Sequence, residues 1–189
     1  MRAPALFSSA AAPVLLIGGW LLAESRQPPA FDPLHDAISD LAAIGTPDRA
    51  IMTVALAGTG LAHLITAYGL TEAARAGRLL IALGGVATIG VAVFPLPAQG
   101  GSAAHTAAAT VAFLALAVWP LLGAGARPAL RPPISIAAGA ILLALVTWFG
   151  VTLQAGGPLG LAERAAAAAQ AIWPFVVAVS IHAGLPARR

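Results

Sequence analysis

Three side chains that can transfer protons lie close to the starts of long apolar segments. Asp40 lies in a polar stretch before one of these segments, His105 opens a second, and Glu163 precedes a third. Carboxyl and imidazole groups are the common general acids and bases of enzymes, because modest changes of environment bring their pKa values near neutrality. We therefore take Asp40, His105 and Glu163 as candidate catalytic residues.

Further polar and aromatic side chains near the same segments are candidates for substrate binding. Arg49 and Arg164 could hold an anionic headgroup, and Gln170 shares a helical face with Glu163 inside an alanine-rich stretch that could line a cavity. A structural interpretation competes, since acids are favoured at helix N-termini and each arginine can pair with a local acid. The predicted binding residues are His35, Ser39, Arg49, Trp148, Arg164, Gln170 and Trp173.

Metal and nucleophile chemistry is less well supported by the spacing. Oxygen and nitrogen ligands for zinc exist, but no H-x-x-x-H or H-E-x-x-H spacing does, so we assign no metal site. A triad of Ser39, Asp40 and His105 lacks the G-x-S-x-G turn. Haem would need two histidines at one depth, which His63 and His182 only weakly suggest. The sequence names no cofactor.

The elements that must position these residues are membrane-spanning helices. Of 189 residues, 59% are hydrophobic and 9% charged, whereas soluble domains carry roughly 25% charged residues. Six segments approach the roughly 20 apolar residues that cross a bilayer; they lie near residues 6–23, 50–70, 79–96, 105–122, 134–153 and 165–185. We predict an all-α polytopic membrane protein, with six helices in a tight bundle and one transmembrane domain over 1–189. The first segment could alternatively be a signal peptide.

The longest connection, before the second span, carries a helical pattern. In Phe31–Leu41, apolar residues at Leu34, Ile38 and Leu41 fall on one stripe, Asp32 can cap the start, and Gly45 can end the helix. We predict a short amphipathic helix here, lying at the membrane interface or over the mouth of the bundle.

The arginines indicate an orientation. Seven of the ten fall on the side that holds both termini, and positive residues favour the cytoplasmic side. We predict a multi-pass protein of the cell membrane with cytoplasmic N- and C-termini. All acids except Glu72 then lie at the opposite, extracytoplasmic end. The arginines are too dispersed for nucleic-acid binding, and the absence of cysteine excludes disulfides and thiolate chemistry.

Several short motifs resemble those of a known family. Ile38-Ser39-Asp40-Leu41, the stretch Gly90 to Pro95 with His105 after it, and Gly160 to Arg164 reaching Trp173 are similar to a bacterial family of six-span membrane proteins, catalogued as domain of unknown function 998 and common in actinobacteria. The resemblance implies six helices and no established activity. An acid often follows the Phe-Pro pair in that family; here Leu96 follows it, so we expect no acid role for this loop.

These observations favour an integral membrane protein with an extracytoplasmic-facing polar pocket. We expect an enzyme or binder that acts on an amphipathic lipid or isoprenoid by acid/base chemistry of the lyase, isomerase, cyclase or hydrolase type. One alternative is a non-catalytic partner subunit, or a homo-oligomer, that docks through small-residue faces. Another is a small proton-coupled transporter with His63 as a relay; otherwise His63 is a packing residue.

Overall fold

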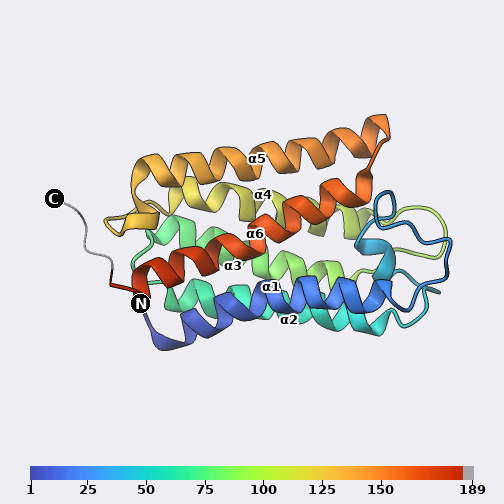
Figure 1. Ribbon diagram of the computed structural model, residues 1–189, viewed down its shortest axis with the longest axis horizontal. Coiled ribbons are helices and arrows are strands. Elements are labelled where there is room, and N and C mark those ends of the chain that lie inside the picture. The colour runs from blue at the N-terminus through green and yellow to red at the C-terminus, as the bar shows by residue number, and fades with distance from the viewer. Residues whose placement is uncertain (185–189) are drawn as a thin grey trace.

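The computed structural model describes residues 1–184 and contains six long helices and two short 3-10 helices in that range. Figure 1 shows the long helices side by side, with the N-terminus and the end of the last helix at the same end. All six are long and apolar enough to cross a membrane, and the chain is a multi-pass membrane protein. The helices are α1 (Ala3–Glu24), η1 (Ser39–Ala42), α2 (Ala50–Gly69), α3 (Arg75–Val93), α4 (Ala103–Leu122), η2 (Pro128–Leu130), α5 (Pro132–Ala155) and α6 (Leu159–His182).

The long helices form a closed ring in chain order. Each packs against its neighbour in sequence, and α6 returns to pack against α1. Because the connections are short, neighbouring helices run antiparallel. The first, third and fifth connections therefore lie at one end, which we call the loop end. The N-terminus and the end of α6 lie at the other, which we call the terminal end (Figure 1).

Small residues allow the backbones to approach closely, as the composition predicts. A Cβ added to Gly60 of α2 would lie 2.5 Å from the carbonyl oxygen of Gly85 in α3, and one added to Gly85 would lie 2.7 Å from the carbonyl oxygen of Gly60. Only glycine fits at either position. Such contacts replace the hydrophobic driving force that is absent between helices in lipid.

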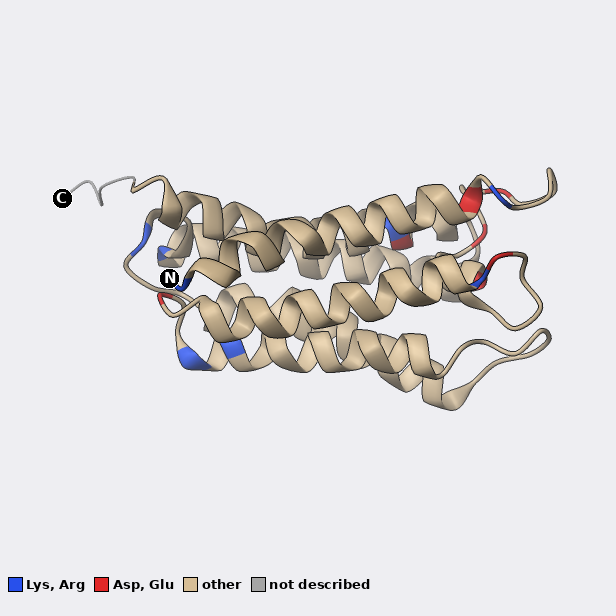
Figure 2. Cartoon of the chain, turned by 90° about the horizontal axis from the view of Figure 1, so that it is seen from below, with Lys and Arg blue, Asp and Glu red and all other residues tan. Residues whose placement is uncertain are grey.

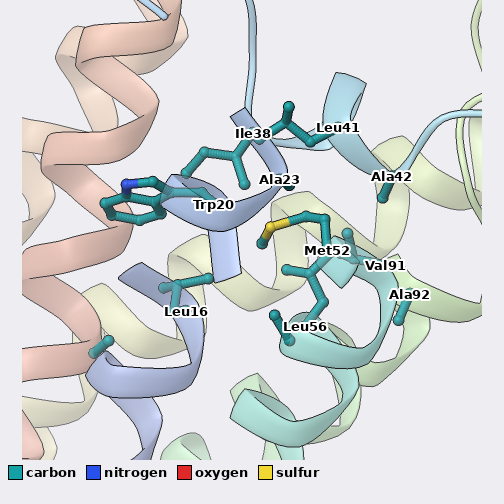
Figure 3. Close-up of a cluster of buried hydrophobic side chains, with 12 residues drawn as sticks. Leu16, Trp20, Ala23, Ile38, Leu41, Ala42, Met52, Leu56, Val91 and Ala92 are labelled. Atoms are coloured by element: carbon teal, nitrogen blue, oxygen red, sulfur yellow. The ribbon is translucent and has the colours of Figure 1, made fainter. Parts of the chain in front are cut away.

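Two clusters of buried apolar side chains fill the bundle. The loop-end cluster joins α1, α2, α3 and α6 to η1, and it includes Leu16, Trp20, Leu41 and Met52 (Figure 3). The terminal-end cluster includes Trp119, Leu70, Leu130 and Val177, all fully buried. The terminal half of the bundle is therefore packed with large apolar side chains.

Charged residues gather toward the two ends, with most acids at one end and most of the described arginines at the other (Figure 2). The acids other than Glu72 lie at the loop end, together with Arg26, Arg49 and Arg164, and the other described arginines lie at the terminal end. Two arginines used to predict the orientation, Arg188 and Arg189, lie outside the described residues, as does the predicted end of the sixth span at residue 185.

Two boundaries differ from the sequence prediction in ways that affect the site. Helix α6 begins at Leu159 and not near residue 165, so that Glu163 and Arg164 lie within the helix. Helix α3 covers 75–93 and not 79–96, which leaves Leu96 in the following connection.

The predicted amphipathic helix over Phe31–Leu41 is wrong in extent, since only Ser39–Ala42 is helical. The physical reason is local competition from acidic side chains, whose carboxylate oxygens accept backbone N–H groups and favour turns over a continuous helix. These hydrogen bonds run from Leu34 to Asp32 (2.9 Å), from Asp32 to Asp36 (2.7 Å) and from Ala37 to Asp40 (2.8 Å).

Candidate functional site

A narrow cavity of about 70 Å³ lies inside the bundle, bordered by α1, α2, α3, α4, α6 and the start of η1. Its walls are mainly apolar and include Leu16, Leu56, Val91 and Phe113. The polar side chains that border it are Ser39, Thr59, His63, Thr88, His105, Glu163 and Gln170. The cavity has room for a few water molecules or for a slender apolar chain.

His105 is buried near the start of α4, in a position fixed by local capping. The Ser102 side chain accepts a hydrogen bond from the His105 backbone N–H at 3.3 Å, which begins the helix. The His105 Nδ1 lies 2.9 Å from the carbonyl oxygen of Phe94. Because a carbonyl oxygen can only accept, Nδ1 carries the proton, and in the neutral ring Nε2 is left with a lone pair. His105 can therefore act as a base.

Glu163 is buried in the second turn of α6 and also connects that helix to the first loop. Its Oε2 accepts a hydrogen bond from the backbone N–H of Ile38 at 2.6 Å, at the residue that begins η1. The same carboxyl group borders the cavity with His105. The structure thus brings two of the three predicted catalytic residues, from α4 and α6, to one cavity.

Asp40 lies near this pair but borders a different space. It lines a wide, open hollow of about 610 Å³ at the loop end, together with Asp36, Thr46 and Gln99. Burial raises the pKa of the Asp40 carboxyl, while the hydrogen bond from Ala37 and the charges of His105 and Arg164 act in the opposite direction. The structure therefore places Asp40 within electrostatic range of His105 but outside the narrow cavity.

Arg164 is engaged in contacts within the chain. Its Nε and Nη2 donate to the Glu24 carboxylate, and its Nη1 donates to the carbonyl oxygens of Asp36 (2.8 Å) and Gly160 (2.9 Å). These bonds tie α6 to the end of α1 and to the first loop. Arg49 donates from Nε to the Ala42 carbonyl oxygen at 3.1 Å. Neither guanidinium borders the narrow cavity.

The remaining predicted binding residues divide into two groups. Ser39 and Gln170 border the cavity, and Gln170 donates from Nε2 to the Phe113 carbonyl oxygen at 2.8 Å, which leaves its oxygen available. The other three lie elsewhere. His35 is exposed and contacts Asp32, Trp148 is partly exposed on α5, and Trp173 borders a separate apolar groove between α5 and α6.

Three polar residues of the cavity were absent from the predicted set. Thr59 and His63 lie four residues apart on one face of α2, a spacing visible in the sequence, but a histidine within a span is as consistent with packing as with binding. Thr88 of α3 is a single threonine in an apolar span, and nothing in the sequence around it indicates a binding role. The cavity depends on which faces of five helices converge, and no local pattern encodes that.

The histidines and acids do not form a metal centre within residues 1–184, since no three of them come together in a way that could hold an ion. His63 and His182 also differ in their surroundings, because His63 borders the cavity whereas His182 is exposed at the end of α6.

The chain was compared with family models, curated proteins and solved structures. The family model described as "Protein of unknown function (DUF998)" matches residues 10–180, most of the chain. No curated protein and no solved structure matches. The geometry of the cavity is thus the main source of functional information.

Proposed function

The chain belongs to the DUF998 family of proteins of unknown function. From the geometry of its cavity, we propose that it binds an amphipathic lipid or isoprenoid and acts on it by acid/base chemistry. The observation that carries the proposal is that His105 and Glu163 border one buried, mainly apolar cavity. An apolar pocket with a few converging polar groups is typical of a small-molecule site. A carboxyl group and a histidine are costly to bury in the membrane, and residues of these types within spans commonly mark functional sites.

The two side chains have complementary roles in this proposal. The Nε2 lone pair of His105 takes a proton from the bound molecule, and the Glu163 carboxyl group supplies one to a neighbouring atom. If Glu163 gives its proton to the far carbon of an alkene and His105 removes one from the allylic carbon, the double bond moves by one position. The composition does not change, so the reaction is an isomerisation. Proton exchange with water at the loop end then restores both groups. Asp40 contributes by its charge near His105.

The cavity limits what can enter. Its volume is too small for a whole phospholipid, so a single apolar chain or an isoprenoid fits best. In this proposal the loop end is extracytoplasmic and the occupant enters from that side of the cell membrane. A headgroup would remain at the loop end, where Arg49 and Arg164 lie, although neither borders the cavity.

Two variants separate the acid/base roles from folding. His105→Asn keeps a side-chain N–H that can reach the Phe94 carbonyl oxygen but removes Nε2. Glu163→Gln keeps an oxygen that can accept from Ile38 but cannot ionise. Purified wild-type protein should carry an isoprenoid or lipid that mass spectrometry detects after extraction, and should convert it to a product. Both variants should remain folded and lose conversion by at least about 100-fold, the contribution typical of general acid/base catalysis.

The control is His35→Asn, which removes an exposed imidazole that contacts only Asp32. It should retain full conversion. Equal conversion by wild type and both cavity variants would remove the catalytic part of the proposal. A wild-type protein that carries no enriched lipid or isoprenoid would remove the binding part.

Of the alternatives, a docking role has a specific observation in its favour. Helix α5 is the least buried of the six, and a mainly apolar groove of about 240 Å³ lies between it and α6. A partner helix could pack there, which would suit a partner subunit or a homo-oligomer. Proton-coupled transport is disfavoured by the terminal-end cluster, which fills the path beyond His63 with Trp119, Leu70 and other buried side chains.

A further inference from the structure

His63 is a buried polar group whose hydrogen-bonding capacity is not used within the described chain. Its side chain is 1% exposed, it borders the cavity, and its Nδ1 has no hydrogen-bond partner among residues 1–184. An unsatisfied buried polar atom destabilises the fold. Because no protein group bonds to the ring within residues 1–184, a molecule in the cavity that His63 borders is the partner that could give the imidazole a hydrogen bond.

His63 lies at the deep end of the cavity, far from His105. A Cβ added to Gly85 would lie 3.1 Å from the Cβ of His63, and one added to the adjacent Gly84 would lie 2.5 Å from Cγ of Leu116. His63 is therefore level with Leu116 of α4. At a rise of about 1.5 Å per residue, Leu116 lies roughly 16 Å below His105 along the helix. The cavity is long and narrow, with polar groups near both ends.

Two threonine hydroxyl groups complete the deep end. Thr59 donates to the Ala55 carbonyl oxygen at 2.7 Å, and Thr88 donates to the Gly84 carbonyl oxygen at 2.8 Å. Their protons are used, but their oxygen lone pairs can still accept. No charged side chain borders the cavity at this depth. An imidazole N–H with nearby acceptor oxygens matches an uncharged hydroxyl group, which both donates and accepts.

We propose that the cavity binds a slender molecule that is polar at both ends, and that His63, with Thr59 and Thr88, binds an uncharged hydroxyl group at its buried end. This proposal rests on the proposed function for the other end, where His105 and Glu163 contact the occupant. The apolar wall between the two ends contacts the hydrocarbon chain of the molecule.

The test compares two probes of equal chain length, decanol and decane-1,10-diol, with the full-length protein in detergent. Each affinity is corrected for the partition of that probe into micelles, measured without protein, because the alcohol and the diol partition differently. Wild-type protein should prefer the diol by roughly fivefold to tenfold, the factor expected from one buried hydrogen bond. His63→Leu should reduce this preference to about one, without loss of decanol binding.

His182→Leu is the matched control, because His182 is exposed outside the cavity, and it should keep the wild-type preference. An unchanged preference in His63→Leu would overturn the role of His63. Equal affinities of wild type for both probes would also overturn it, and would mean that water alone occupies the deep end. Failure of wild type to bind either probe would instead count against the proposed function.

Discussion

At the scale of single residues, charged side chains of the loop end hold the first loop in place, and one of them also borders the cavity. Glu163 borders the cavity and also accepts the backbone N–H that begins η1. Arg164, next in sequence, points its donors at Glu24 and at two carbonyl oxygens. Neighbouring residues on one helix turn therefore hold the first loop in place, and one of them also provides the site with its carboxyl group.

Asp40 gives a pH prediction. Because its pKa is raised by burial in the folded state, the ionised carboxylate is less favourable in the folded than in the unfolded chain. Its contribution to stability is complete below the ordinary carboxyl pKa of 3.8 and is lost as the pH rises through the folded value. Asp40→Asn keeps an oxygen for the Ala37 N–H, and it should raise Tm relative to wild type at neutral pH but not at a pH below 3.8.

The control for this prediction is Asp48→Asn, which removes the same charge from an exposed position of the same connection. Its effect on Tm should vary less with pH. A Tm difference for Asp40→Asn that shrinks as the pH rises from acidic to neutral would contradict the prediction. Thermal unfolding in detergent, followed by circular dichroism, measures both variants.

At the scale of elements, the close crossing of α2 and α3 determines where His63 lies. Gly60 and Gly85 bring the two backbones together, and Gly85 also faces the Cβ of His63. The sequence showed glycine in both spans but gave no means of pairing one with the other. In the first loop, by contrast, the sequence has the apolar spacing of a helix, but most of the segment does not form one. Acidic side chains there accept hydrogen bonds from nearby backbone N–H groups and favour turns.

The helix crossing can be tested by substitution. Gly60→Val places a Cβ about 2.5 Å from the Gly85 carbonyl oxygen, so the backbones must separate. We expect a loss of about 1–3 kcal/mol of stability, the usual cost of overpacking. Gly18→Val adds the same atoms to α1, where no neighbouring atom lies within 4 Å, and should be nearly neutral. Similar Tm values for the two variants would show that this contact does not limit the packing.

At the scale of the whole molecule, polarity is distributed unequally between the ends. The loop end carries every acid except Glu72, the open hollow and the entrance side of the proposed site. The terminal end carries most of the described arginines and the apolar cluster around Trp119. Positive charge favours the cytoplasmic side. The molecule is therefore expected to open away from the cytoplasm.

Orientation can be measured directly, because the chain has no cysteine of its own. Single variants Ser25→Cys at the loop end and Thr71→Cys at the terminal end are both exposed. In intact cells, a membrane-impermeant maleimide should label the cysteine at 25 and not the one at 71, and permeabilised cells should show both labelled. The reverse pattern would overturn the predicted topology and the side from which the proposed occupant enters.

The sequence by itself determined the membrane location, the six helices and the acid and histidine positions near helix starts, because these follow from composition, apolar length and local capping. Only the tertiary structure decided that His105, Glu163 and His63 border one cavity. It also decided that four of the predicted binding residues do not border it: Trp148, Trp173, Arg49 and Arg164. That outcome depends on α6 closing the ring against α1 and on glycine contacts between helices, and such long-range packing leaves no periodic signal in the chain.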